Sequence, residues 1–447
     1  MRTCILPALI VVTAALPAGD PAPMTKLTVA GHPTMIIGLT TSKWDYRGGK
    51  DASKGFWAEG GKVGVYLPPG PVRGIMFNIN EHSQRPQYPA SAWGFASFTY
   101  EYGWIEAVMK SNGLQAYLDD LAKQTGRPEL ASAPLAFLFR QFTGANGIAD
   151  AFTRNKAIAD KTLAVGLIMF DSKHMDKYAV HGIPTHHPIE GRDNHPPSFD
   201  DGFFKPGKPV TTSIEWGFIH GQYGKHEMNW AFFDAIVEER MPIAPPKDGK
   251  HEPMRRIDVA AGWLGDGSDR EAQWREIAPM ADYKGDRSKA IWLPNAEYAF
   301  AWRGSMTPRS PIQITGPVAP YGFSTQTGKP VGNADIVAPG RTTITWGPAV
   351  PDRERGNDRR QPVASEVAQV KKVVLRVGER VLGEGAGSTG SLTAEFGPGM
   401  HQIVAIAELN DGSFRSSRPA SLIVSGDMYA GLAAAREARA KSGGKKP

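Results

Sequence analysis

The sequence predicts an α/β protein in which helices flank a mostly parallel sheet, followed by an all-β sandwich near the C-terminus. Two observations lead to this expectation. Between residues 62 and 245, short apolar runs typical of strands alternate with helical patterns, an order that favours a parallel sheet. Beyond residue 366, strand-like runs follow one another with glycine and aspartate turns between them, which is typical of a small antiparallel sandwich.

Residues 1–22 have the features of a secretory signal peptide. One early arginine precedes an apolar run, and small residues close the segment. No later segment offers the roughly 18 uninterrupted apolar residues of a membrane span, so we expect none. The mature protein is therefore expected to be secreted or periplasmic.

Cysteine content and charge exclude several function classes. The single cysteine, Cys4, lies within the predicted signal, so the mature chain has no disulfide, no cysteine–zinc site and no cysteine nucleophile. The net charge of +6 comes from 51 basic and 45 acidic residues, and much of the excess lies in the tail 427–447. So small an excess indicates no nucleic-acid partner, and we expect a flexible, solvated tail.

Each predicted element of the α/β part has its own signal. A Pro-Pro-Gly turn separates two strand-like runs, and apolar residues spaced by three and four predict a long helix after them. A loop-rich stretch, 171–210, contains one short segment near Ile183. The expected elements are strands 62–67, 74–79, 134–139, 162–170 and 211–219, and helices 104–124, 147–159 and 229–241.

The boundaries of the predicted parts follow proline-rich and charged stretches. The segment 246–350 has short strands and one helix without a clear period, and 351–365 is charged and bounded by proline. The predicted division is a signal peptide 1–22, an α/β domain 30–245, an extension 246–350, a linker 351–365, an immunoglobulin-like sandwich 366–426 and a basic flexible tail 427–447.

Three segments follow the chain order of nucleophile, acid and histidine that a hydrolytic triad uses in some α/β enzymes. The stretch "FRQFTG" (139–144) ends a strand at the place of a nucleophile, but Thr143 is its only hydroxyl residue. Asp193 follows in a glycine-containing loop, and His220 follows the strand 211–219 ahead of a helix. Asp193 would orient His220, which would act as the base. Thr143 could instead cap the next helix.

Residues 60–245 resemble secreted bacterial α/β-hydrolases of the dienelactone-hydrolase and polyester-depolymerase type. The resemblance rests on "VYLPPGPVRGIMF", "LDDLAKQTGRPELASAPLAFLF", "IP" ahead of Asp193, the run from His220 to "FFDAIVEERMP" and the later "APMADYKGDRSKAIWLPNAEYAFAW". It implies the α/β-hydrolase fold and a Gly-x-Ser-x-Gly motif between Phe139 and Gly144. In this chain the position of that serine falls on Gln141, Phe142 or Thr143.

The same resemblance implies an oxyanion site and a substrate pocket. The backbone N–H of Gly144 and a group in the stretch 78–84, with Asn80 first among them, are the candidate donors, and Gln141 lies beside them in sequence. A plain turn role for residues 80–82 remains an alternative.

A histidine-rich region offers a metal site as a competing hypothesis. Seven histidines fall between residues 174 and 226, with several acidic residues among them. The region lacks the spacing of a helical zinc motif, and two adjacent histidines on a strand point to opposite faces. Solvated loop histidines are the alternative, and we expect neither a metal nor another cofactor.

These observations favour an exported carboxylic ester hydrolase that acts on a small-molecule or polymeric ester. A catalytically silent homologue that binds a ligand or polymer is the second hypothesis, and a metal-assisted hydrolase is the third. The aromatic segments 93–104 and 297–302 would either stack on such ligands or fill the core. The sequence does not fix the oligomeric state.

Overall fold

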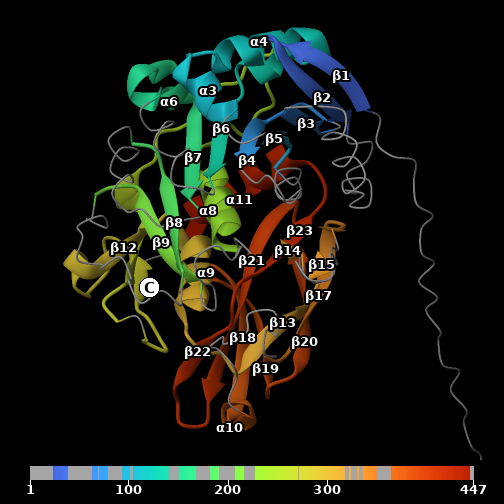
Figure 1. Ribbon diagram of the computed structural model, residues 1–447. Coiled ribbons are helices and arrows are strands. Elements are labelled where there is room, and N and C mark those ends of the chain that lie inside the picture. Colours follow the sequence, from blue (N-terminus) through green and yellow to red (C-terminus); the bar gives the residue numbers. More distant parts are fainter. Residues whose placement is uncertain are drawn as a thin grey trace, which may run out of the picture.

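The structure is a computed structural model, shown in Figure 1. It describes residues 24–38, 63–68, 70–78, 93–100, 104–139, 151–167, 182–190, 207–215, 227–269, 271–317, 322–323, 330–331, 336–349 and 364–442. The predicted signal peptide and almost all of the predicted linker lie outside these ranges.

A mostly parallel sheet of nine strands forms the first part of the chain. Its strands stand in the order β1-β2-β3-β5-β4-β6-β7-β8-β9. The pairs β1–β2 and β3–β5 are antiparallel, and the other neighbours are parallel. The strands are β1 (Met24–Val29), β2 (His32–Gly38), β3 (Val63–Leu67), β4 (Gly74–Asn78), β5 (Phe95–Tyr100), β6 (Leu135–Phe139), β7 (Thr162–Leu167), β8 (Thr185–Glu190) and β9 (Val210–Glu215).

Helices cover both faces of this sheet, as the sequence predicted. The described helices of the whole chain, including those away from the sheet, are α3 (Trp104–Lys110), α4 (Leu114–Thr125), η1 (Pro128–Ala131), α6 (Lys156–Lys161), α8 (Glu227–Arg240), η3 (Val259–Ala261), η4 (Arg287–Lys289), α9 (Ala296–Met306), α10 (Ala364–Ala368) and α11 (Met428–Ser442). The predicted helix 104–124 is two helices, because Asn112 adopts a left-handed φ of 56° between them.

Alternation along the strands divides the core into two layers. Phe77 on β4 and Phe137 on β6 face α3 and α4, whereas their neighbours Met76 and Leu138 face α8 and α9. Successive side chains of a strand point to opposite faces, so an unbroken apolar run fits a sheet covered on both sides.

The segment after α8 seals the β9 edge of the sheet. It forms the three-stranded sheet β11-β10-β12, with β10 (Trp263–Asp266), β11 (Ile277–Pro279) and β12 (Ala290–Leu293), and then α9. The indole Nε1 of Trp302 donates to the Thr212 carbonyl at 2.6 Å, and the Ile214 N–H donates to the Met306 sulfur at 3.2 Å. Side chains of α9 therefore satisfy backbone groups that an edge strand leaves open.

Two small sheets close the chain and pack face to face around one apolar core. One is β13-β17-β20 and the other is β16-β23-β21-β18-β19, with β22 paired to β21. The strands are β13 (Ile312–Gly316), β16 (Ile336–Val337), β17 (Gly340–Pro348), β18 (Val370–Val377), β19 (Arg380–Ala386), β20 (Gly390–Phe396), β21 (Gly399–Leu409), β22 (Phe414–Ser416) and β23 (Ala420–Val424); β14 (Gly322–Phe323) pairs with β15 (Pro330–Val331).

Three predicted boundaries are corrected by these pairings. The main sheet begins at Met24, ahead of residue 30, because β1 pairs with β2. The two-sheet unit begins at Ile312, ahead of residue 366, because β13 contributes Ile312 and Ile314 to its core and β17 contributes Ile344 and Trp346. The stretch between β17 and α10 connects strands of this one unit.

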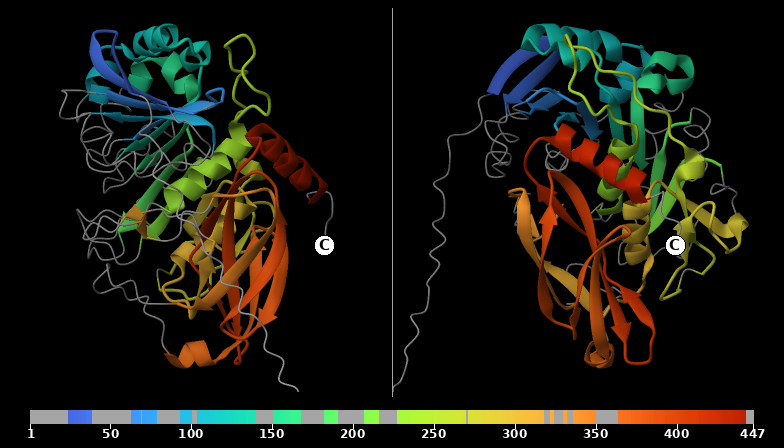
Figure 2. Two further views of the ribbon diagram at one scale, coloured as in Figure 1. Left: turned by 90° about the vertical axis from the view of Figure 1, so that its right-hand side faces the viewer. Right: turned by 180° about the vertical axis from the view of Figure 1, so that it is seen from behind.

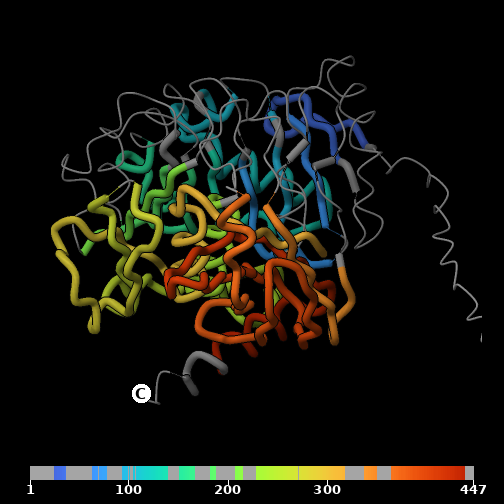
Figure 3. Tube along the Cα trace, turned by 90° about the horizontal axis from the view of Figure 1, so that it is seen from below, coloured from blue at the N-terminus to red at the C-terminus, as the bar shows by residue number. Residues whose placement is uncertain are grey.

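The basic tail is also corrected, because residues 428–442 form α11. Leu432 is buried in the core layer beneath the main sheet, and Arg436 donates to the Glu238 carbonyl of α8 at 2.7 Å. An apolar contact and a cap on the α8 C-terminus hold the helix in place. Figure 2 shows α8, α9 and α11 where the main sheet meets the two-sheet unit, and Figure 3 shows the two-sheet unit from below, in orange and red. None of the helices in the described part combines the length and apolar character that a bilayer crossing needs.

Candidate functional site

The carboxyl edge of the main sheet is the candidate site. Strands β4, β6, β7, β8 and β9 lie side by side and are mutually parallel. Their C-terminal ends therefore share one edge, and in open α/β sheets ligands bind in the crevice at that edge.

The six predicted site residues come, in sequence, after strands that end at this edge. In sequence, Asn80 follows β4, Asp193 follows β8 and His220 follows β9. Gln141, Thr143 and Gly144 follow β6. All six lie outside the described residues, so the structure gives the strand that precedes each of them in sequence and no distance between their side chains.

Helix α8 packs closely against the carboxyl half of β7 because Gly166 has no side chain. A Cβ at Gly166 would lie 2.8 Å from Asn229 Oδ1 and 2.9 Å from a methyl group of Leu138. A glycine is thus required where the helix crosses the strand. The close crossing brings Asn229 over β8.

A fully buried polar cluster lies beneath α8. His186 Nδ1 is 2.6 Å from Asn229 Oδ1, and His186 Nε2 is 3.0 Å from Ser213 Oγ. All three residues have no exposed surface, and the His186 ring stacks on Phe232 with centroids 5.5 Å apart. The Asn229 oxygen only accepts, so Nδ1 carries the proton and Nε2 accepts from the Ser213 hydroxyl.

This cluster has the bonding order of a nucleophile, a base and an orienting group, but its burial assigns it a structural role. A nucleophile must contact substrate, and the Ser213 hydroxyl lies in the closed core. The bonds tie α8 to β8 and β9 without leaving a buried polar atom unpaired. The sequence analysis missed this cluster; polar residues inside "THHPIE" and "VTTSIE" were its only signal.

The metal hypothesis loses two of its ligands in this arrangement. His186 and His187 occupy consecutive positions of β8 and are buried, and both ring nitrogens of His186 have protein partners. Within the described ranges, no three His, Cys, Asp or Glu side chains are placed to hold a metal ion. The other five clustered histidines fall outside those ranges.

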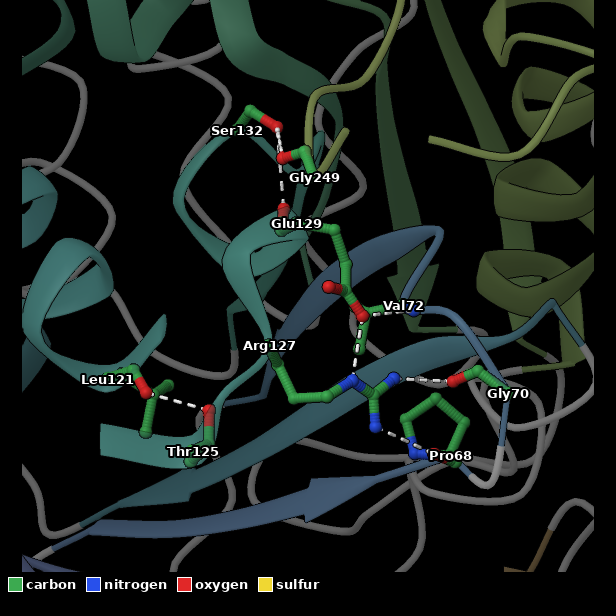
Figure 4. Close-up of polar contacts among 9 residues, drawn as sticks. All are labelled: Pro68, Gly70, Val72, Leu121, Thr125, Arg127, Glu129, Ser132 and Gly249. Atoms are coloured by element: carbon green, nitrogen blue, oxygen red, sulfur yellow. Dashed lines mark hydrogen bonds and ion pairs between the residues drawn. The ribbon is translucent and has the colours of Figure 1, made fainter. Parts of the chain in front are cut away.

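A second polar network fastens the opposite, amino edge of the sheet (Figure 4). Arg127 pairs with Glu129 at 2.7 Å and also donates to the carbonyls of Pro68 and Gly70. The Glu129 carboxylate also accepts from the Val72 N–H, at 3.2 Å. These bonds join the β3–β4 connection to the end of α4.

The protonation states of Glu129 and His251 in this network fit a structural role. Burial would raise the pKa of Glu129, but hydrogen bonds from Arg127 and backbone N–H groups outweigh it, and the pKa is lowered. Burial lowers the pKa of His251 nearby to about 4, so its ring is neutral at neutral pH. The ionised Glu129 serves as an anchor for Arg127 and the loop.

The described aromatic side chains of the two segments singled out in the sequence fill the core. Trp93, Trp104 and Trp302 are buried, and the Trp93 indole donates to Asp234 at 2.8 Å. Core packing therefore accounts for them, and they form no exposed stacking surface.

No protein-family model matches the chain, and no curated protein matches it. Among solved structures, fibronectin(III)-like modules of Clostridium thermocellum CbhA share 16% identity over 26% of this chain and 45% of that chain, with a TM-score of 0.17. A glycosyl hydrolase family 2 member from Bacteroides cellulosilyticus shares 10% identity over 90% of this chain and 50% of that chain, with a TM-score of 0.22. A Bacteroides uniformis β-glucuronidase shares 10% identity over 80% of this chain and 46% of that chain, with a TM-score of 0.15. The chain spans half or less of the length of these three, and such TM-scores define neither fold nor activity.

Proposed function

We propose that this chain is an exported carboxylic ester hydrolase of the α/β-hydrolase fold, with its active site at the carboxyl edge of the main sheet. Thr143 is the nucleophile, His220 the general base and Asp193 the group that orients it. Asn80, Gln141 and Gly144 line the oxyanion side of the pocket. The two-sheet unit is an immunoglobulin-like sandwich.

The sheet topology carries the proposal. Apart from β1, the strand order is β2-β3-β5-β4-β6-β7-β8-β9, which is the order of the α/β-hydrolase sheet. In that fold the nucleophile follows the fifth of these eight strands, and the acid and the histidine follow later strands. Here Thr143 follows β6, Asp193 follows β8 and His220 follows β9 in sequence, and these three strands end at the same edge.

The proposed chemistry is acyl transfer to a hydroxyl. His220 takes the proton of Thr143 as its oxygen attacks the ester carbonyl, and Asp193 stabilises the imidazolium. The Gly144 N–H donates to the oxyanion, the alcohol leaves with the proton from His220, and water then releases the acid. The threonine methyl restricts χ1 at the turn, so we expect a slow enzyme.

Hydrolysis of p-nitrophenyl butyrate by the purified mature protein tests the proposal. Thr143→Ala and His220→Ala should each lower kcat/KM by at least about 100-fold, because each removes a member of one catalytic unit. Asp193→Asn should lower it too. Thr393→Ala is the matched control, since the Thr393 side chain is exposed on β20 and its hydroxyl is 2.8 Å from that of Thr343.

The outcomes separate the three hypotheses. If the protein hydrolyses the ester no faster than buffer does, the ester hydrolase hypothesis is wrong. The hypothesis of a catalytically silent binding protein then remains. Turnover that survives His220→Ala but is abolished by a chelator and restored by zinc would indicate the metal-assisted hydrolase instead.

A further inference from the structure

A cluster of arginine and aromatic side chains lies where α9, the 271–276 loop and the two-sheet unit meet. We call it the junction cluster; it consists of Trp274, Phe300, Arg303, Arg376 and Phe414. The guanidinium carbon of Arg303 is 3.9 Å from the Trp274 ring centroid. Both Arg303 and Arg376 lie 4.8 Å from the Phe300 centroid. Trp274 and Phe414 contact each other with centroids 5.4 Å apart.

Neither guanidinium group forms an ion pair with a described residue, although the negative charge of Glu379 partly offsets the burial that lowers the pKa of Arg376. Arg303 is only 6% exposed, and no ion pair or hydrogen bond engages its side chain within the described ranges. Arg376 donates to the backbone carbonyl of Glu379 at 2.9 Å, but its Nε has no partner there. Burial, and then the like charge of Arg376, lower the pKa of Arg303 to about 9.

Stacking on aromatic rings offsets only part of the free-energy cost of burying these charges. Cation–π contacts are weak compared with the desolvation of a buried charge, and the mutual repulsion of two arginines adds to the deficit. An oxyanion would supply the missing charge, and guanidinium groups bind carboxylate, phosphate and sulfate through directed N–H groups.

The outer rim of the cluster is apolar and exposed. Trp274 and Phe414 retain 38% and 42% of their surface, and they are two of four exposed large apolar side chains among the described residues. Aromatic rims contact flat or apolar rings.

We propose that the junction cluster binds a ligand that carries a carboxylate, phosphate or sulfate group on a ring, with the anion at Arg303 and Arg376 and the ring against Trp274 and Phe414. The site shares no residue with the proposed triad. The proposed anion site can therefore be tested independently of the ester hydrolase proposal.

Isothermal titration calorimetry on the full mature chain, at constant ionic strength in chloride, tests the proposal with three probes. Phenyl phosphate should bind saturably and more tightly than inorganic phosphate, and benzyl alcohol should not bind. Arg303→Gln and Arg376→Gln should each weaken phenyl phosphate binding at least about tenfold, the effect of losing a charged hydrogen bond. Trp274→Ala should abolish the advantage of phenyl phosphate over inorganic phosphate.

Two variants serve as controls. Arg341→Gln removes the same charge from an exposed position on β17 and should bind as wild type does. His220→Ala should also bind normally, which separates this site from the proposed active site. If Arg303→Gln does not fold, Arg376→Gln decides alone. Absence of saturable binding at about 10 mM phenyl phosphate, or wild-type affinity in the folded arginine variants, would overturn the site.

Discussion

At the scale of single residues, the carboxyl group of Glu297 has a strongly raised pKa. It lies in the first turn of α9 and accepts a hydrogen bond from the Gln402 N–H of β21. Burial first, and then the like charge of Asp234, raise its pKa to about 8. Near neutral pH the folded protein therefore holds a proton that the unfolded chain has released.

This proton makes stability depend on pH. The pKa of Glu297 is higher in the folded state than the roughly 4.3 of an unfolded glutamate, so its contribution is full below that value and is lost as pH rises through about 8. Glu297→Gln keeps the acceptor but cannot ionise. Between pH 5 and 9, wild type should lose on the order of 4 kcal/mol more unfolding free energy than the variant.

Urea denaturation at pH 5, 7 and 9 measures this difference. Glu395→Gln, at an exposed position of β20, is the matched control and should follow wild type. If the unfolding free energies of wild type and Glu297→Gln change with pH in parallel, Glu297 is not protonated in the folded protein at neutral pH.

The candidate site shows what residue patterns can and cannot predict. The order of Thr143, Asp193 and His220 along the chain could be read because strands and loops alternate. The pairing of His186 with Asn229 and Ser213 could not, because these contacts join residues far apart in sequence through a helix crossing set by Gly166. Nor did composition separate Arg303 from an ordinary surface arginine.

At the scale of elements, α9 acts as the cover of strand β9. Trp302→Phe keeps an aromatic ring in place but leaves the Thr212 carbonyl without its indole donor. We expect a loss of about 1–2 kcal/mol in unfolding free energy beyond the effect of the smaller ring, because a buried acceptor is left unsatisfied.

Trp346→Phe is the matched control for the size of the ring. Trp346 is equally buried, and its Nε1 has no hydrogen-bond partner among the described residues. Equal destabilisation of the two variants in denaturant titrations would show that the indole bond to β9 contributes nothing.

Whether a helix or strand could be predicted from the sequence depended on how its faces are buried. Strands β6 and β7 and helix α8 were predicted because both faces are covered, which requires long apolar runs. Strand β17 was missed because only Thr342, Ile344 and Trp346 of its alternating pattern point inward. Helix α11 was taken for a tail because alanine and basic residues dominate it and Leu432 supplies most of its apolar contact.

At the scale of the whole molecule, the main sheet and the two-sheet unit share a core. Met400 and Ile423, from β21 and β23, join the layer that α8 and α9 form under the sheet. Gly304 allows α9 to reach the backbone of the two-sheet unit, since a Cβ there would overlap the Ser417 carbonyl oxygen. The two parts should therefore unfold in a single transition.

Gly304→Ala tests this contact against helix propensity. Alanine favours a helix over glycine by about 1 kcal/mol, yet the clash with Ser417 should lower the unfolding free energy by roughly 1–3 kcal/mol. Differential scanning calorimetry should show a lower Tm. Gly397→Ala, where a Cβ meets open space, should leave it unchanged; an unchanged or higher Tm for Gly304→Ala would disprove the tight contact.

The cover that α9 places over β9 also bears on self-association. Strand β9 cannot accept a strand from another molecule while Trp302 and Met306 occupy its backbone groups. At the opposite margin, β1 pairs with β2 alone among the described strands, and α4 bonds it through Gln124, which donates to the Thr28 carbonyl at 2.8 Å. A dimer built by continuing the main sheet across two copies would therefore join them through β1.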